Sequence, residues 1–75
     1  MKRLLRVMEA VWSGDLEDIP RHTYVRHVGG EGFVIGTNAR GEYLISMNKK
    51  EADAVKAFPQ EILAVWLDGA WKKVK

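Results

Sequence analysis

Residues 32–47 read GFVIGTNARGEYLISM, and this stretch decides the fold. At its centre, residues 38–41 (NARG) place Asn at the first position of a turn and Gly at the fourth. Asn hydrogen-bonds to the backbone that follows it, and Gly accepts the positive φ with which a chain re-enters a strand. Apolar segments flank the turn, so the pattern predicts a β-hairpin. In simple register Gly36 lies opposite Tyr43 and Ile35 opposite Leu44, whereas a bulge at Gly41 shifts these pairs by one.

Asp68-Gly69 predicts a second turn. Both central residues of a type I′ turn need positive φ, and Asp-Gly between apolar segments is a strong hairpin signal. This hairpin joins residues 61–67 to 70–74 and places Trp66 opposite Trp71, with Leu67 opposite Ala70. We expect the last strand to be a sheet edge. If Trp66 is the better buried of the two indoles, Trp71 lies near the rim.

The remaining elements are shorter. A strand over residues 22–28 follows Ile19-Pro20, and a helix is predicted over about 49–57. Asn48 can cap that helix, Glu51 completes a capping-box pattern, and Pro59 ends it. Residues 3–12 fit both a helical stripe and a strand face, and we favour a strand because the neighbouring elements are strands.

Together these elements predict a fold of the α+β class that is mostly β. We expect a five- or six-stranded antiparallel bent sheet or partly open barrel with one short helix. Residues 1–75 form a single small domain, because a chain of this length supports one core. The layout resembles that of SH3-like barrels with a helical insertion, and this resemblance implies a small barrel whose function depends on its surface.

Composition narrows the function classes. The chain has 47% hydrophobic and 29% charged residues, no cysteine and a formal net charge of +2. The absence of cysteine favours the cytoplasm and excludes thiolate chemistry and zinc fingers. No apolar run is long enough to span a membrane, and we expect no signal peptide at the N-terminus. A nucleic-acid-binding domain of this size usually carries a stronger basic excess.

The glycines at 29, 30 and 32 raise the question of phosphate binding. A phosphate cradle needs a glycine loop that leads into a helix N-terminus, where backbone N–H groups converge on the anion. Here the loop leads into the apolar run 33–35, which is a predicted strand, and Glu31 adds a negative charge to the loop. These glycines are therefore expected to turn corners, and we expect no cofactor.

Few residues of the sequence fit the pattern of a catalytic or metal-binding site. His22 and His27 are five residues apart, so a strand places them on opposite faces where they share no metal, and we expect both to be solvent-facing or on an edge strand. Ser13 and Ser46 lie in no recognisable nucleophile context. The acidic cluster of Asp15, Glu17 and Asp18 lacks the ligand number and spacing of a calcium loop. We therefore predict no catalytic residue and no metal site, and we interpret the acidic cluster as a solvated loop that could dock a partner.

Basic residues gather near both ends of the sequence. Trp71, Lys73 and Lys75 alternate onto one strand face, where an aromatic ring with flanking cations could bind single-stranded nucleic acid. Lysines at termini also keep a small domain soluble and protect a sheet edge from aggregation, and we favour that interpretation.

We therefore expect a small non-enzymatic domain that binds another protein or forms a homodimer. Three tryptophans exceed what a core of this size readily buries, and tryptophan is enriched in binding hot spots. Single-domain inhibitors or regulators of a host machine, such as those carried by phages and mobile elements, fit such a chain. The expected partner-binding residues are Trp71, Lys73, Lys75, Asp15, Glu17 and Asp18. The alternative is a nucleic-acid-binding SH3-like or OB-like module that uses the C-terminal lysines and tryptophan.

Overall fold

The computed structural model describes residues 10–74, and the regular structure of these residues is mostly β-strand, with two short 3-10 turns. The strands are β1 (Ala10–Val11), β2 (Tyr24–His27), β3 (Gly30–Thr37), β4 (Tyr43–Ser46), β5 (Val55–Ala57), β6 (Ile62–Leu67) and β7 (Ala70–Lys73). Two 3-10 turns, η1 (Glu51–Asp53) and η2 (Pro59–Glu61), precede β5 and β6. The predicted mostly-β fold is confirmed. Of the strand expected over residues 3–12, the part before residue 10 lies outside the described residues.

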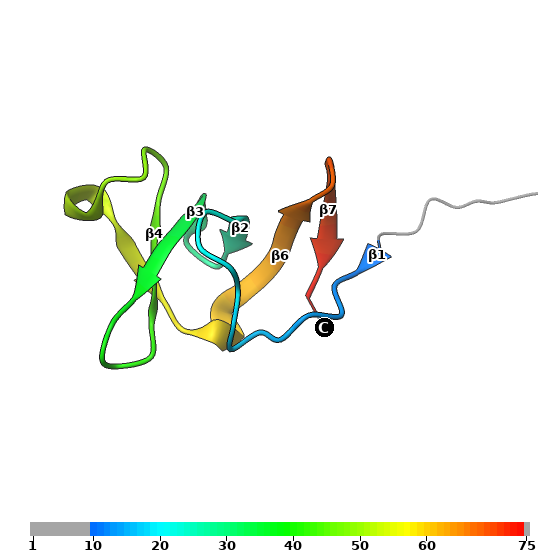
Figure 1. Cartoon of the computed structure of the whole chain (residues 1–75), viewed down its shortest axis with the longest axis horizontal. Coiled ribbons are helices and arrows are strands. Elements are labelled where there is room, and N and C mark those ends of the chain that lie inside the picture. Colours follow the sequence, from blue (N-terminus) through cyan, green and yellow to red (C-terminus); the bar gives the residue numbers. More distant parts are fainter. Residues whose placement is uncertain (1–9, 75) are drawn as a thin grey trace, which may run out of the picture.

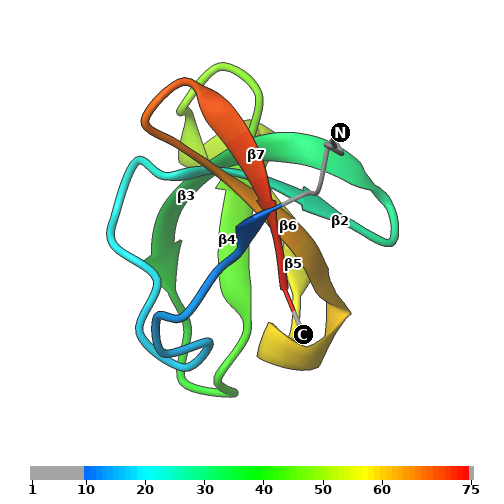
Figure 2. The same cartoon turned by 90° about the vertical axis from the view of Figure 1, so that its right-hand side faces the viewer.

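All seven strands form one sheet in the order β1-β7-β6-β2-β3-β4-β5 (Figure 1). The six strands from β2 to β7 pair antiparallel with their neighbours, whereas β1 adds two residues parallel to β7. The view at right angles shows that the sheet curls (Figure 2). Curling lets one face of a small sheet surround a common core, so the expectation of a bent antiparallel sheet is confirmed.

The core follows from the two-residue period of the strands. In β2, Val25 and His27 are buried, whereas Arg26 between them is exposed. The core cluster is mainly aliphatic and draws on five strands and the loop before β2: Ile19, Val25, Val34, Tyr43, Ile45, Ala57, Ile62 and Val65. Strand β2 is central to this arrangement because it pairs with β3 on one side and β6 on the other.

The first predicted hairpin is β3–β4. The N–H of Gly41 donates to the carbonyl of Asn38 at 3.1 Å, and Gly41 has φ of 86°, as the turn requires. Beside the turn Gly36 lies opposite Leu44, not Tyr43, so the simple register is wrong there and the register shifted by one is correct. The shift begins at the turn, where Gly41 has positive φ, and an irregularity at Ile35 ends it, because Val34 pairs with Ile45 as in the simple register.

The second predicted hairpin is β6–β7. Asp68 and Gly69 both have positive φ, 55° and 78°, as a type I′ turn requires. Trp66 lies opposite Trp71 and Leu67 opposite Ala70, so the predicted register is confirmed. The outer side of β7 is not a bare edge, however. Strand β1 pairs with it, and the N–H of the next residue, Trp12, donates to the carbonyl of Lys73 at 2.8 Å.

The helix predicted over about 49–57 does not form. The segment contains only the three-residue turn η1, and β5 then pairs with β4. A helix this short is marginal by itself, and Ala52 and Val55, which share one face of such a helix, are both exposed and do not enter the core. Pairing with β4 instead satisfies the backbone and buries Ala57. Asn48 is not the helix cap, because its side-chain oxygen accepts from the N–H of Lys50 at 2.9 Å within a turn.

Tyr43 ties the loop before β2 to the core. Its ring is buried, and its hydroxyl donates to the carbonyl of Leu16 at 2.8 Å and accepts from the N–H of Ile19 at 2.9 Å. Burial, opposed by the bond from Ile19 and aided by the nearby loop carboxylates, raises the pKa of the Tyr43 hydroxyl above its usual 10.0. One side chain thus ties the acidic loop to the core at Leu16 and Ile19.

The turn glycines give the first testable prediction. Replacing Gly41 or Gly69 with Val forces a β-branched residue to a positive φ, so we expect each variant to lose at least about 1 kcal/mol of unfolding free energy. Gly36→Val is the matched control, because Gly36 lies in extended β3 and a side chain there would meet open space. Urea denaturation measures all three variants. Equal stability of Gly41→Val and Gly36→Val would contradict the turn assignment.

The hydroxyl of Tyr43 gives the second prediction. Tyr43→Phe leaves a buried carbonyl and N–H without their partner, so we expect a loss of about 1–3 kcal/mol. The folded state also holds the tyrosine proton more tightly than the unfolded state, so stability should fall as pH rises above about 10. Denaturation at pH 8 and at pH 11 tests this, and the variant should lose less stability between these pH values than the wild type.

Candidate binding site: an aromatic face on four strands

Four aromatic side chains lie in one row across the sheet. Tyr24 of β2 is opposite Phe33 of β3 on one side and Trp66 of β6 on the other, and Trp66 is opposite Trp71 of β7. Residues that are directly opposite in neighbouring strands share a face of the sheet. We call Phe33, Tyr24, Trp66 and Trp71 the aromatic row. It lies on the face opposite the core, because Val25 and Val65, which follow and precede row members, are fully buried.

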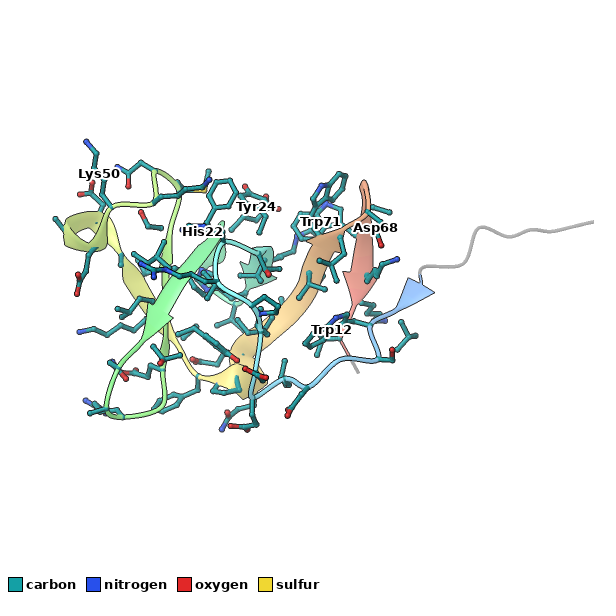
Figure 3. All side chains as sticks on the ribbon, in the orientation of Figure 1. Trp12, His22, Tyr24, Lys50, Asp68 and Trp71 are labelled. Atoms are coloured by element: carbon teal, nitrogen blue, oxygen red, sulfur yellow. The ribbon has the colours of Figure 1, made fainter. Side chains whose placement is uncertain are left out.

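The rings of the aromatic row contact one another. The ring centroids of Phe33 and Tyr24 are 4.9 Å apart, those of Tyr24 and Trp71 are 5.8 Å apart, and those of Trp71 and Trp66 are 5.4 Å apart. The Tyr24–Phe33 and Trp66–Trp71 pairs are edge-to-face, an arrangement that aromatic quadrupoles favour. Figure 3 shows Tyr24 and Trp71 near each other on one side of the molecule, with Trp12 well away from them.

A second row runs beside the first, two residues along each strand. It contains Glu31 of β3, Arg26 of β2, Ala64 of β6 and Lys73 of β7, in register. The Nε of Arg26 donates to Glu31 at 3.0 Å, and the guanidinium carbon lies 4.4 Å from the ring centroid of Trp71. Arg26 therefore links the two rows through an ion pair and a cation–π contact.

Polar groups also hold the other end of the face. The hydroxyl of Tyr24 donates to Glu31 at 3.1 Å, and the ammonium of Lys49 lies 4.5 Å from the ring centroid of Phe33. Desolvation, and then the hydrogen bond to Glu31, raises the pKa of the Tyr24 hydroxyl above its usual value. The hydrogen bond to Glu31 uses the protonated phenol, the form that the raised pKa favours.

Two hollows lie on this face. The first, the aromatic groove, has a volume of about 460 Å³ and is lined by the four rings of the aromatic row and by Glu31. The second, the basic hollow, has a volume of about 260 Å³ and is lined by Arg26, Leu63, Ala64, Trp71 and Lys73. Trp71 lines both hollows, so a ligand that crosses its ring can reach the two together.

The structure places the predicted C-terminal residues on this face in part. Trp71 and Lys73 lie there, and Lys75 lies outside the described residues. The relative burial of the two indoles differs from the expectation: Trp66 is 42% exposed, whereas Trp71 is half-buried. The reason is that Trp71 is clasped by Arg26 and by the rings of its neighbours, whereas Trp66 is the more open end of its pair.

The predicted acidic residues do not join this face. Asp15, Glu17 and Asp18 are all exposed in the loop before β2, and they line neither the aromatic groove nor the basic hollow. A side-chain oxygen of Asp15 accepts from the N–H of Glu17 at 2.8 Å, so one of these carboxylates has a local role in the turn. The acidic loop is therefore a surface separate from the two hollows that Trp71 lines.

The glycine stretch turns a corner, as predicted. Val28 and Gly29 form the turn of the β2–β3 hairpin, and Gly30 pairs with His27 as β3 begins. The expectation for His27 is wrong, because this side chain is 6% exposed and accepts from the N–H of Gly29 at 3.1 Å. Its position follows from the two-residue period, which places it beside Val25 on the inner face. His22 is exposed, as expected.

Two negative findings apply to residues 10–74. In this range, no three or more His, Asp or Glu side chains come together in a group that could hold a metal ion. The same residues form no helix of the length and hydrophobicity that a membrane crossing requires.

Reasoning from the sequence missed most of the aromatic face. Tyr24, Phe33 and Arg26 were not singled out, and Glu31 was noted only as a charge against phosphate binding, although all four occupy alternate positions of β2 and β3. The available signal was the alternation itself: aliphatic residues at 25 and 34 indicate the inner face, so 24, 26, 31 and 33 must point outward. The register of β2 with β6, which places Trp66 beside Tyr24, carries no comparable sequence signal.

Comparisons with known proteins add no information about the function of this face. No protein-family model, no curated protein and no solved structure matches the chain. The case for a function therefore depends on the geometry of the aromatic face.

The unequal burial of the two indoles gives the third prediction. Trp71→Ala removes a half-buried ring that Arg26 and two other rings contact, so we expect a loss of about 1–3 kcal/mol of unfolding free energy. Trp66→Ala removes a more exposed ring and should cost less, about 1 kcal/mol or below. Urea denaturation midpoints measure both. A larger loss for Trp66→Ala than for Trp71→Ala would contradict the burial order.

Proposed function

We propose that this chain is a protein-interaction domain whose binding surface is the aromatic face. The observation that carries the proposal is the aromatic row, in which four large rings lie in register on the sheet face opposite the core. A small domain gains little stability from an indole that is 42% exposed, as Trp66 is. Aromatic residues beside an arginine are the side chains that most often anchor protein interfaces.

The position of the face supports binding through side chains. Strands β2 and β6 each have a paired neighbour on both sides, so their backbone groups cannot accept an additional strand from a partner. A partner segment must therefore pack across the rings. The aromatic groove is open and shallow enough to receive such a segment, and its lining is mainly ring surface with one carboxylate.

We further propose an SH3-like layout and a regulatory role. The strand order β6-β2-β3-β4-β5, with a 3-10 turn immediately before β6, supports the SH3-like resemblance. In this proposal the domain acts as a non-enzymatic inhibitor or regulator by occupying a surface of a larger machine. The polar groups of the face favour binding over catalysis, since Arg26, Glu31 and Tyr24 bond to one another.

A single-stranded nucleic acid is the second candidate. It is favoured by the combination of stacked rings with Arg26, Lys49 and Lys73 on or beside the same face. Two features weigh against it. The carboxylate of Glu31 lies within the aromatic groove, where it would repel a phosphate backbone, and two of the cations already cover ring faces on which bases would stack.

Affinity capture from the native cell tests the proposed function. We expect a protein partner that survives nuclease treatment and is lost with Trp66→Ala. The matched control is Val55→Ala, which removes a side chain of similar exposure on β5, at the far end of the sheet. The control should capture the partner as well as wild type does.

Three results would contradict the proposal. The first is a partner retained by Trp66→Ala, which would place the interface elsewhere. The second is loss of all partners on nuclease treatment, which would favour nucleic acid. The third is a binding signal that falls steeply with salt, by about one logarithmic unit of affinity per phosphate contact for each tenfold rise in salt. If the captured protein is a second copy of this chain, the face is a homodimer interface.

A further inference from the structure

A third hollow lies beside the aromatic face, and its lining is rich in basic side chains. The hollow has a volume of about 390 Å³. Arg21 and His22 reach it from the turn before β2, and Lys49 and Glu51 reach it from the segment between β4 and β5. Thr37, at the end of β3, adds a hydroxyl. We call this space the turn hollow, because two turns that are far apart in the sequence supply its three basic residues.

The turn before β2 holds its two basic residues in place. The N–H of His22 donates to the carbonyl of Val34, and the N–H of Val34 donates to the carbonyl of Thr23 at 2.8 Å. His22 has φ of 73°, a conformation that residues other than glycine seldom adopt. Hydrogen bonds to β3 therefore fix the backbone from which Arg21 and His22 reach the hollow.

The turn after β4 is fixed in a similar way. The side-chain oxygen of Asn48 accepts from the N–H of Lys50 at 2.9 Å, and its amide donates to Asp53 at 2.8 Å. Lys49 has φ of 64°, where glycine would be less strained. The contact of its ammonium with the ring of Phe33 uses one side of a group that has several N–H donors. Lys49 is thus held at the edge of the turn hollow with donors left for a ligand.

The chemistry of the lining favours a phosphoryl group. Among residues 10–74, no carboxylate forms an ion pair with Arg21 or Lys49. Donors that come from two separate turns need an acceptor with oxygens on several sides. The terminal phosphoryl of a monoester has three such oxygens and a charge of about −2, whereas a carboxylate has two oxygens in one plane and a single charge. A nucleic-acid phosphodiester has only two free oxygens and also a single charge.

Glu51 opposes an anion but does not close the hollow. Its side chain is exposed at the first position of η1, so the carboxylate can turn toward solvent. The permanent charges of the lining are then two cations, Arg21 and Lys49, against this one carboxylate. Removing the charge of Glu51 should therefore strengthen the binding of an anion.

We propose that the turn hollow binds the phosphoryl group of a phosphate monoester. Arg21 and Lys49 bind its oxygens from the two turns, and the imidazole of His22 and the hydroxyl of Thr37 donate to the oxygens that remain. Free phosphate, a small ester and a phosphorylated side chain of a partner share this chemistry. The site does not depend on the protein-binding function proposed above, because none of the rings of the aromatic row lines it.

Gly36 offers a way to fill the hollow. It lines the hollow and lies opposite Leu44, another lining residue, so a side chain at position 36 shares the face of Leu44 and enters the same space. A Cβ at Gly36 meets nothing within 4 Å. Gly36→Val should therefore occupy the hollow and leave the fold intact.

Titration of the whole chain, followed by amide chemical shifts at constant ionic strength, tests the proposal. The probes are inorganic phosphate, a phosphoserine peptide, the same peptide with serine, and acetate. We expect inorganic phosphate and the phosphoserine peptide to bind about tenfold or more tightly than acetate and the serine peptide, with saturable shifts at residues 21–22, 36–37 and 49–51. Tighter binding of the phosphoserine peptide than of inorganic phosphate identifies a partner's side chain as the source, and equal binding identifies a free phosphate or small ester.

Five variants locate the site. Arg21→Gln and Lys49→Gln should each lower the affinity for phosphate about tenfold, Gly36→Val should abolish binding, and Glu51→Gln should raise the affinity. Lys73→Gln is the matched control, because it removes the same charge from the basic hollow on β7 and should leave phosphate binding unchanged. Urea denaturation midpoints report whether each variant folds. If Gly36→Val does not fold, the gain expected for Glu51→Gln decides, since damage to the fold cannot produce it.

Several outcomes would overturn the proposal. They are equal binding of acetate and phosphate, a folded Gly36→Val variant that binds as wild type does, and an unchanged affinity in Glu51→Gln. An equal loss in Lys73→Gln and Arg21→Gln would also overturn it, because it would show a response to net charge alone. So would an oligothymidylate that binds the same residues more tightly than the phosphoserine peptide. Trp66→Ala should bind phosphate as wild type does, so this proposal and the protein-binding function can fail separately.

Discussion

The four residues of β2 are the constraint on which the rest of the molecule depends. Tyr24–His27 joins the half of the sheet made by β3, β4 and β5 to the half made by β6 and β7, and every residue of the strand has a partner on both sides. Side chains alternate between the two faces of a strand, so Val25 and His27 point into the core and Tyr24 and Arg26 point to the opposite face. The core and the aromatic face are two consequences of one short segment.

Local signals located the two hairpin turns. Gly41 and the pair Asp68-Gly69 have positive φ, which these residue types tolerate, so both hairpins could be located from the sequence. The helix over 49–57 failed for the opposite reason. Its signal was a weak local propensity, and the unpaired side of β4 offered Val55–Ala57 a better arrangement. Local preference decided the structure only where no long-range partner competed with it.

The candidate site could be predicted from the sequence only in part. That Trp71 and Lys73 share a face follows from spacing along one strand, and it could be predicted. Tyr24 and Phe33 join this surface because β2 pairs with β6. That pairing joins segments about forty residues apart, and no turn signal in the sequence predicts it. The face is also more balanced in charge than a count of lysines suggests, because Glu31 engages Arg26 and Tyr24. That internal bonding fixes the orientation of the rings before any ligand arrives, which lowers the entropy that binding must overcome.

The parallel contact between β1 and β7 has a kinetic consequence. It pairs Ala10 with Lys72, so it closes a loop that includes nearly all of residues 10–74. A contact between residues so far apart in the sequence forms late in folding, and as the outermost pairing beside β7 we expect it to open before the β6–β7 pairing in native fluctuations. When it opens, the outer backbone edge of β7 is released while β6 still holds Trp71 in place. The amides of β7 that face β1 should therefore exchange with solvent faster than those that face β6, which makes one strand both a stable wall of the site and an intermittently open edge.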